Sequence, residues 1–518
     1  MIEIFLEKNI LNKVKLLTLC YDTPSLSLDT ACNRLHLSPV ELKNYCHKLN
    51  VLFGHKLSIH ISKERILCKL NKLTQEDALK IVYNESNTLQ LLKFLIDDSS
   101  DKKSLVAFGN DLFLSRSSVY RLRENLIPLI KDLGLSLSKN TIVGDEYRIR
   151  YLIAYLTTKF GIKIYDLSAL DIKIIRQFLF ESGTNIRPTT HLSDIFVFFD
   201  TLFILTWKRH HHKVKIPNSK LFSSLKKIFI YEELNTCVKS IVQPYFNVIF
   251  NSEDMDYIFL IYLTSANSFA AQKWTETHVD EVLAIFKSLP KFQMLLQPLK
   301  EALPYSDTYY DELVKVTIYF SRNFIVGLNQ LIPETLSFPS TFYPGNNPKL
   351  ISIIEPIVTH WLTEIGESKF KKTHFFLLCA HLERVIKNSM PPINIVLLTT
   401  DFINNEILKD YILQSLSTDK IRFHSYYLLT DNISQISTLK PDLIITNRKL
   451  FTYVTKELAT NSLVAHIDYN DTPSQISNIQ TIISNIKEEK YRKSLIKYNI
   501  TYCILLISII NKTTRALH

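Results

Sequence analysis

Basic and hydroxyl side chains that could bind a polyanion cluster within residues 115–131. Four bases in this segment oppose one acid, a surplus of 4 − 1 = +3, and they are Arg116, Arg121, Arg123 and Lys131 against Glu124. Arginine can donate two hydrogen bonds to a guanine edge, while hydroxyl and ammonium groups hold phosphates. The segment therefore favours contact with duplex DNA, provided that one element presents these side chains together.

A helix meets that requirement. Apolar residues recur through the segment at helical spacing and predict an inward face, namely Val119, Leu122, Leu126 and Leu129. The remaining polar positions predict an outer face that binds DNA, namely Ser115, Arg116, Ser117, Ser118, Tyr120, Arg121 and Arg123. Ser115 is expected to cap this recognition helix. We assign Leu105, Val106, Phe108, Leu112 and Leu114 to the supporting helix of a helix-turn-helix.

A two-stranded wing is predicted after Gly134, which should end the recognition helix. The segment LSLSKNTIVGDEYRI alternates as strands do and contains a turn near Lys139-Asn140. Lys139 at this turn is a further candidate for DNA contact.

The same plan occurs about 77 residues earlier in the chain. Ser38 and Pro39 predict the start of a first recognition helix, and LSIHIS at 57–62 predicts its wing. Its expected inward positions are Val40, Leu42, Tyr45, Cys46 and Leu49, and its expected DNA-binding residues are Lys43, Asn44 and Lys48. Further helices are expected over 14–20 and around 88–96. A single basic helix is more often a solvated face, but two tandem copies favour DNA binding.

Composition limits the other functions. A length of 518 residues predicts several domains, since a typical domain has about 150. The net charge is 61 − 50 = +11, which is compatible with a polyanionic partner. Nine glycines form neither a dinucleotide fingerprint nor a phosphate-binding P-loop, and seven cysteines form no CxxC pair. We therefore expect no cofactor and no metal site, and no disulfide framework.

The first residues include acids and lack the uninterrupted apolar core of an export signal, and the longest apolar run is far below the ~18 residues of a membrane span. The sequence predicts a soluble protein of the reducing cytoplasm that does not bind membranes.

The stretch from Ser115 to Leu156 resembles a known family. Its serine-rich turn, arginine-bearing helix and G-x-E-x-x-I-R pattern, here Gly144, Glu146, Ile149 and Arg150, are similar to the second helix-turn-helix of the Mga/AtxA family of Gram-positive transcriptional regulators. The resemblance extends along the chain and implies five domains. They are winged helix-turn-helix units at 1–70 and 71–165, helical domains similar to phosphotransferase-system (PTS) regulation domains (PRDs) at 166–275 and 276–390, and a domain similar to the sugar-transporter component EIIB at 391–518.

The later sequence fits that order. Residues 167–390 are nearly all helix-like, with a predicted boundary near 268–278, and short apolar strands alternate with helices after Pro391-Pro392. This alternation predicts a small parallel α/β sheet. The loop TTDFINN after the first strand lacks the cysteine that EIIB enzymes phosphorylate, and Cys379 precedes that strand. An interaction role, which in the family is self-association, is therefore favoured over phosphotransfer.

Histidines form the remaining candidate sites. For His210, His211 and His212, a solvated helix end, a metal site and a phosphoacceptor are the alternatives, and side-chain chemistry favours the first. The resemblance implies phosphorylation in a pattern R-x-x-H-x-V, met by Arg209, His212 and Val214, although His211 replaces the usual glycine. A second pair, His374 and His381, lies seven residues apart and is either structural or phosphorylated.

These observations lead to one hypothesis. The chain is a non-enzymatic, DNA-binding transcriptional regulator, dimeric or larger through its C-terminal domain and modulated by PTS phosphocarrier proteins, and some relatives activate virulence genes. The alternatives are an RNA-binding antiterminator or protein-interaction regulator, and a phosphotransferase that uses the C-terminal sheet.

Overall fold

The computed structural model of the chain describes residues 2–62, 64–71, 73–97, 104–184, 196–246, 248–265, 274–333, 347–367, 370–400, 402–415, 420–458, 462–467 and 472–515. The chain divides into two compact units. Unit 1 comprises residues 1–292, 318–343 and 366–375, and unit 2 comprises residues 293–317, 344–365 and 376–518.

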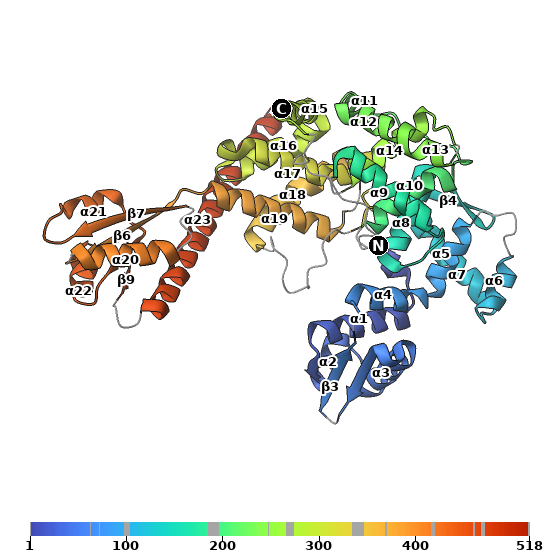
Figure 1. The fold of residues 1–518 in the computed structure, drawn as a ribbon, viewed down its shortest axis with the longest axis horizontal. Helices are drawn as coiled ribbons and strands as arrows, with labels where there is room; N and C mark the ends of the chain where they lie inside the picture. Colours follow the sequence, from blue (N-terminus) through green and yellow to red (C-terminus); the bar gives the residue numbers. More distant parts are fainter. Residues whose placement is uncertain are drawn as a thin grey trace. The chain divides into compact units, whose positions relative to one another are not determined.

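Unit 1 begins with a winged helix-turn-helix (Figure 1). Its elements are η1 (Ile2–Phe5), α1 (Lys8–Asp22), β1 (Ser25–Ser27), α2 (Leu28–Leu35), α3 (Pro39–Phe53), η2 (Gly54–Lys56), β2 (Leu57–Ile61) and β3 (Arg65–Leu70). The strands form an antiparallel sheet in the order β1-β3-β2, so the predicted wing is confirmed and has a third strand.

The predicted start of α3 is confirmed. Ser38 is the N-cap and Pro39 occupies the first turn, while Glu41 Oε2 accepts a hydrogen bond of 2.9 Å from the Ser38 backbone N–H in a capping box. The prediction that Val40 faces inward is wrong, because its side chain is 78% exposed. In the first turn, apolar spacing alone does not fix the buried face, because helix packing starts only at Leu42.

A second winged helix-turn-helix follows. Its elements are α4 (Gln75–Asn84), α5 (Asn87–Ile96), α6 (Leu105–Asp111), α7 (Arg116–Asp132), β4 (Leu135–Ser138) and β5 (Thr141–Gly144). The strands β4 and β5 form the predicted antiparallel wing around Lys139-Asn140. The supporting helix α6 is shorter than predicted, because it ends at Asp111 and leaves Leu112 and Leu114 in the turn. Helix α4 was not predicted.

Close packing joins α6 to α7. A Cβ atom added to Gly109 in α6 would lie 2.7 Å from Cγ2 of Val119 in α7, so only glycine permits this approach. The inward positions Val119, Leu126 and Leu129 are buried as predicted, and Leu122 is half-buried.

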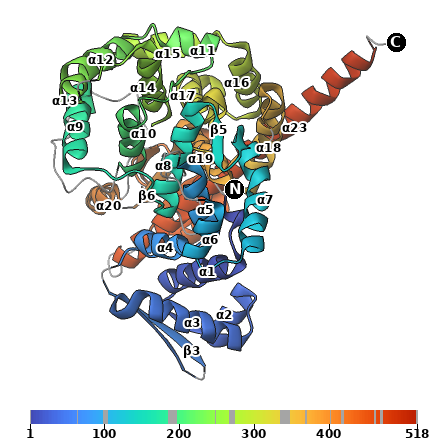
Figure 2. The same ribbon diagram turned by 90° about the vertical axis from the view of Figure 1, so that its right-hand side faces the viewer.

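Helix α8 (Glu146–Phe160) links the winged units to the helices that follow. Most of its side chains are buried, including polar Glu146 and Arg150. It packs on α4 towards its C-terminal end, where the Tyr83 and Phe160 rings meet edge-on at 4.9 Å, and on α10 of the next domain (Figure 2). Helix α8 is therefore a buried connection between the winged units and the helices that follow.

The predicted helical region is confirmed. Its elements are α9 (Ala169–Leu179), η3 (Phe180–Thr184), α10 (Val197–Lys208), α11 (Lys220–Leu225), α12 (Phe229–Cys237), η5 (Val238–Val242), α13 (Gln243–Phe246), α14 (Ser252–Thr264), α15 (Glu276–Lys287), α16 (Pro290–Ala302), η6 (Ser306–Tyr309), α17 (Tyr310–Ser321), η7 (Arg322–Gly327), α18 (Pro348–Ile365) and α19 (Lys372–Ser389). Part of the predicted boundary at 268–278 lies outside the described residues.

Unit 2 contains the predicted parallel α/β sheet. Its elements are β6 (Ile393–Thr399), α20 (Phe402–Ser415), β7 (Ile421–Tyr427), α21 (Ser434–Leu439), β8 (Leu443–Thr446), α22 (Phe451–Tyr453), η8 (Val454–Leu458), β9 (Leu463–His466) and α23 (Thr472–Arg515). The strand order is β7-β6-β8-β9, all parallel. Helices α20 and α23 cover one face, and α21 and α22 the other (Figure 1).

The mostly helical fold class with a small C-terminal sheet is therefore confirmed. Among the described residues, no helix is both long and apolar enough to cross a bilayer.

Candidate functional site

The start of α7 presents hydroxyl and basic groups to solvent. Ser115 Oγ accepts a hydrogen bond of 3.2 Å from the Ser118 backbone N–H and lies 3.0 Å from Ser117 Oγ and 2.8 Å from Ser118 Oγ. Arg116 and Ser117 are exposed in the next turn. This end of the helix therefore combines exposed hydroxyl and guanidinium groups with the positive end of the helix dipole, which suits an anion.

Arg121 is the most available base of this face. Its side chain is exposed, and it has no hydrogen-bond or ion-pair partner among the residues that the structure describes. Arg116 instead lies over the exposed Tyr120 ring, with Cζ 5.8 Å from the ring centroid. Both guanidinium groups remain accessible to a ligand.

Arg123 occupies a different environment from the other predicted arginines. Its Nη2 donates to the backbone carbonyl of Lys139 at 2.9 Å, its Nη1 contacts Glu124 Oε1 at 2.6 Å, and its side chain is only 20% exposed. Lys139 has a φ of +53° at the wing turn, and its side chain is exposed. Arg123 thus ties the wing to the recognition helix, while the Lys139 ammonium remains available to phosphate.

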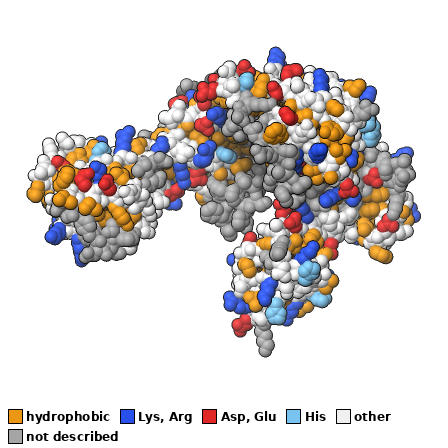
Figure 3. Space-filling view, viewed as in Figure 1, with side chains coloured by type: hydrophobic (Ala, Val, Ile, Leu, Met, Phe, Trp, Pro, Cys, Tyr) orange, Lys and Arg blue, Asp and Glu red, His pale blue; other side chains and the backbone are white. Residues whose placement is uncertain are grey.

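On α3, Lys43, Asn44 and Lys48 are exposed as predicted. The Lys48 ammonium lies 5.9 Å from the ring centroid of Tyr45, whose hydroxyl accepts a hydrogen bond of 3.1 Å from Asn12. Figure 3 shows Lys, Arg and His side chains gathered over the first winged unit. This face is basic, but it carries fewer hydrogen-bond donors than that of α7.

A buried ion cluster follows the second wing directly. Glu146 accepts hydrogen bonds from Nε and Nη2 of Arg209 at 2.8 and 2.9 Å, and from Nε of Arg150 at 2.8 Å. All three side chains are buried. Burial alone would lower the pKa of Arg209, but its hydrogen bond and charge interaction with Glu146 raise that pKa above its usual value. The sequence motif that carries Glu146 and Arg150 is thus a structural clamp.

The clamp holds the histidine run. Nη2 of Arg150 donates to the backbone carbonyls of Arg209 at 3.0 Å and of His212 at 3.2 Å. His211 is exposed, whereas His212 is half-buried with its Nε2 atom inaccessible to solvent. No group of three His, Cys, Asp or Glu side chains among the described residues is arranged to hold a metal ion.

The second histidine pair lies on α19. His374 is only 6% exposed, and His381 is half-buried on the same face of the helix. A phosphate donor protein could reach His374 only if its surroundings opened. In the same helix, burial raises the pKa of the Cys379 thiol to about 12, which keeps it in its unreactive protonated form.

A second connection, which the sequence did not reveal, links the C-terminal end of α7 to η7 through Arg148. Arg148 Nη1 donates to the carbonyls of Leu133 at 3.2 Å and Gly327 at 3.0 Å, and Nη2 donates to that of Val326 at 3.0 Å. Val326 has a φ of +47°, a strained conformation for a β-branched residue. A polar cavity of about 240 Å³ adjoins this connection and is also lined by Glu367.

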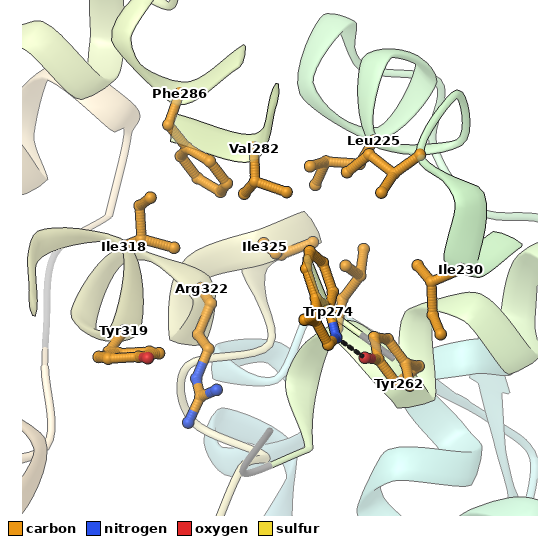
Figure 4. Close-up of a pocket in the computed structure, with 12 residues that line it drawn as sticks. Leu225, Ile230, Tyr262, Trp274, Val282, Phe286, Ile318, Tyr319, Arg322 and Ile325 are labelled. Atoms are coloured by element: carbon orange, nitrogen blue, oxygen red, sulfur yellow. Dashed lines mark hydrogen bonds between the residues drawn. The ribbon is translucent and has the colours of Figure 1, made fainter. Parts of the chain in front are cut away.

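An apolar cavity lies elsewhere in unit 1 (Figure 4). Trp274, Tyr262, Val282 and Phe286 line it, and Trp274 Nε1 donates to the Tyr262 hydroxyl at 3.2 Å. Its volume is about 70 Å³, less than half of the roughly 150 Å³ of an engineered cavity that holds benzene. As it stands it suits at most a very small apolar molecule.

Comparison with known protein families assigns these domains. The M protein trans-acting positive regulator (MGA) HTH domain matches residues 7–65, the Mga helix-turn-helix domain matches residues 71–156, and the M protein trans-acting positive regulator (MGA) PRD domain matches residues 173–385. The chain belongs to the Mga/AtxA family. No curated relative matches it.

Membership makes the chain a DNA-binding transcriptional regulator with PTS regulation domains. The matched regions include both recognition helices, the buried clamp and the histidines.

Proposed function

We propose that α7 and α3 of this Mga/AtxA regulator enter adjacent major grooves, with α7 making the stronger contacts. The exposure of Arg116 and Arg121 at the start of α7, beside a wing tied by Arg123, carries this proposal. Recognition helices place their N-terminal residues against base edges, and wing lysines such as Lys139 contact phosphates. On α3, Lys43, Asn44 and Lys48 have the corresponding roles.

The test is a gel-shift titration of the full chain against duplex DNA, single-stranded DNA and RNA at two salt concentrations. Tight duplex binding should fall as salt rises, because bound phosphates release counterions. Arg116→Ala/Arg121→Ala should weaken it strongly, while Lys227→Ala, remote in sequence and outside both winged units, serves as control. Unchanged affinity in the double arginine variant would refute the proposal.

We further propose that the PTS modifies the histidine run in the cytoplasm. His211 is accessible, and His212 occupies the position that the family pattern favours, which makes these two the leading candidates. A phosphate adds about −1.5 to −2 charges on the hydroxyl-residue scale. Arg150 already donates to the carbonyl of His212, so a new anion there would compete with Glu146 for this guanidinium. His374 and His381 are the second candidates.

Phosphoryl transfer from labelled phosphoenolpyruvate through purified PTS carrier proteins tests this directly. Label should enter the full chain and fall in His211→Ala or His212→Ala, whereas His210→Ala should retain it. Label that persists in both variants and disappears in His374→Ala/His381→Ala would move the site to α19. Complete absence of label would refute modification by these carriers.

Self-association through the C-terminal domain is the third part of the proposal. Helix α20 buries Leu408 and Ile412 against the sheet, while its outward face exposes Phe402, Ile403 and Ile407. Figure 3 shows hydrophobic side chains gathered over this domain. A helix with two apolar faces is typical of a covered interface.

Sedimentation velocity tests the interface. Ile403→Glu/Ile407→Glu should shift the full chain towards monomer, because two carboxylates would have to be buried on association. Lys409→Glu, on the same helix, should leave the distribution unchanged. Identical sedimentation of the double variant and the natural chain would exclude α20 as the contact.

A further inference from the structure

Phe113 has the most unusual environment of any aromatic residue in the winged units. It lies in the turn between α6 and α7, its side chain is 98% exposed, and its φ is +55°. The turn is well defined, since the Phe113 N–H donates to the Asn110 carbonyl at 3.1 Å and the Leu114 N–H donates to the Gly109 carbonyl at 2.8 Å. The ring is therefore held outward by an ordered backbone.

Phenylalanine is a poor choice here for stability. Left-handed backbone favours glycine, and a side chain with a Cβ atom strains it. A ring this exposed gains nothing from burial in the chain itself. Backbone strain combined with an exposed apolar group indicates that the side chain contacts something outside the chain.

The surroundings identify the occupant. Phe113 precedes the N-cap Ser115 by two residues, so its exposed ring belongs to the turn that leads directly into the start of α7, where Arg116 and Ser117 are also exposed. In the first unit, His36 precedes the cap Ser38 by the same two residues, is also exposed and has a φ of +53°. Both turns thus place an exposed ring two residues before the N-cap of a recognition helix, where each helix is expected to meet DNA.

We propose that Phe113 makes an apolar contact with the C5-methyl group of a thymine in the major groove beside α7. Thymine is the base that presents a methyl group in this groove, and phenylalanine is among the side chains that contact it. Phe113 would then add a preference for one A·T pair to the contacts of Arg116 and Arg121. This inference rests on the proposed binding of duplex DNA by α7.

The experiment replaces thymine by deoxyuridine, which pairs identically and lacks only the methyl group. The full chain first selects a duplex from a random-sequence pool, and each thymine of that duplex is then substituted in turn. One substitution should weaken binding by the natural chain about fourfold, the factor expected for one methyl-sized group. Phe113→Ala should bind the thymine duplex about as weakly as the natural chain binds the deoxyuridine duplex. Its affinity should not change when that thymine is replaced by deoxyuridine.

Two further variants keep the result interpretable. Phe113→Gly relieves the backbone strain, so it should fold at least as stably and lose the same thymine preference. Ile127→Ala removes a partly exposed apolar side chain from the distant half of α7, and should retain the full response to deoxyuridine.

Three outcomes would overturn the inference. The first is a natural chain that responds to no deoxyuridine, and the second is a Phe113→Gly variant with unchanged duplex affinity and response. In either case, if Arg116→Ala/Arg121→Ala still abolishes duplex binding, the proposed DNA surface stands and only the role of Phe113 fails. The third is a Phe113 variant that loses affinity for single-stranded RNA alone, which would indicate base stacking instead.

Discussion

The two winged helix-turn-helix units share a local plan and differ in what they present. Six residues after the capping serine, α3 carries Asn44 and α7 carries Arg121. Eight residues after it, α3 buries Cys46, whereas α7 has Arg123 bonded to its wing. The comparison indicates that the fold fixes the capped helix, and that the exposed positions assign each unit its share of DNA contact.

The units also differ in how their wings are held. In the first unit, Asn50 of α3 bonds both backbone groups of Ile59 in β2, at 2.7 and 2.8 Å. In the second unit, Arg123 reaches one carbonyl at the wing turn. The first wing is thus fixed along its strand, and the second at its tip.

Their connections to the rest of unit 1 differ most. The first unit is joined to the ends of α4 and α5 by the ion pair of buried Lys13 with the 37% exposed Glu85, and by a Ser86–Glu7 hydrogen bond. The second is joined to the histidine run by the buried clamp of Glu146, Arg150 and Arg209. The histidine run is therefore connected to the second unit more directly, by buried polar contacts, than to the first.

The largest expected effect comes from removing the clamp. Glu146→Gln leaves two buried guanidinium groups without their carboxylate, and should destabilise unit 1 by about 3–5 kcal/mol. Glu85→Gln should cost less, about 1–3 kcal/mol, because Glu85 is partly in water although the mutation leaves the buried Lys13 ammonium without its partner. Scanning calorimetry of the full chains measures both. Equal shifts would mean that the two units are anchored equally.

The next effect concerns the equivalent positions of the recognition helices. Arg121→Ala should weaken duplex binding by about 1–3 kcal/mol if it reads a base, and Asn44→Ala should weaken it less. Fluorescence anisotropy with one labelled duplex compares the variants directly. A larger loss for Asn44→Ala would reverse the ranking and make α3 the principal reader, since asparagine can bond adenine bidentately.

The wings offer a smaller and more specific comparison. Arg123→Ala removes the bond to the Lys139 carbonyl, whereas Lys139→Ala keeps this backbone bond and removes only the wing charge. We expect both to lower duplex affinity several-fold, but only Arg123→Ala should speed amide hydrogen exchange in β4 and β5. Unaltered exchange in Arg123→Ala would show that the wing is held by its other contacts.

The smallest effect depends on pH. Burial raises the pKa of Glu367, although the nearby Arg148 lowers it in part, so the net shift is upward. A raised carboxyl pKa contributes stability at pH values below its ordinary pKa, and this contribution is lost as the pH rises through the raised value. Glu367→Gln should therefore be slightly more stable than the natural chain at neutral pH, and the gain should vanish in acid. A gain that is independent of pH would contradict this origin.

The sequence predicted local features better than distant ones. Ser38 and Ser115 are recognisable as caps because the cap forms within four residues, and the alternation after Pro391 predicts the parallel strands for the same reason. Val40 and the end of α6 were misjudged because a spacing pattern does not show where packing begins or stops.

The proposed binding surface was predictable in composition but not in detail. The basic face of α7 follows from residue types, yet Arg123 resembles its neighbours in sequence and differs only through a bond to residue 139. The clamp joins Glu146 to a residue 63 positions later, which no local pattern reveals. Phe113 carried only a weak signal in the sequence, namely an aromatic residue next to a serine-rich turn, where a buried side chain would be unusual.

The clamp also limits where this protein can be divided. Any fragment that ends between residues 147 and 208 keeps the Glu146 carboxylate and loses the Arg209 guanidinium that neutralises it. A DNA-binding fragment cut at the nominal end of its second winged unit would therefore lose both this counterion and α10, on which α8 packs, and would expose the many apolar side chains that α8 buries in the full chain. Recombination between relatives, in nature or by design, should succeed more often at junctions after residue 212 than at the boundary that domain length suggests.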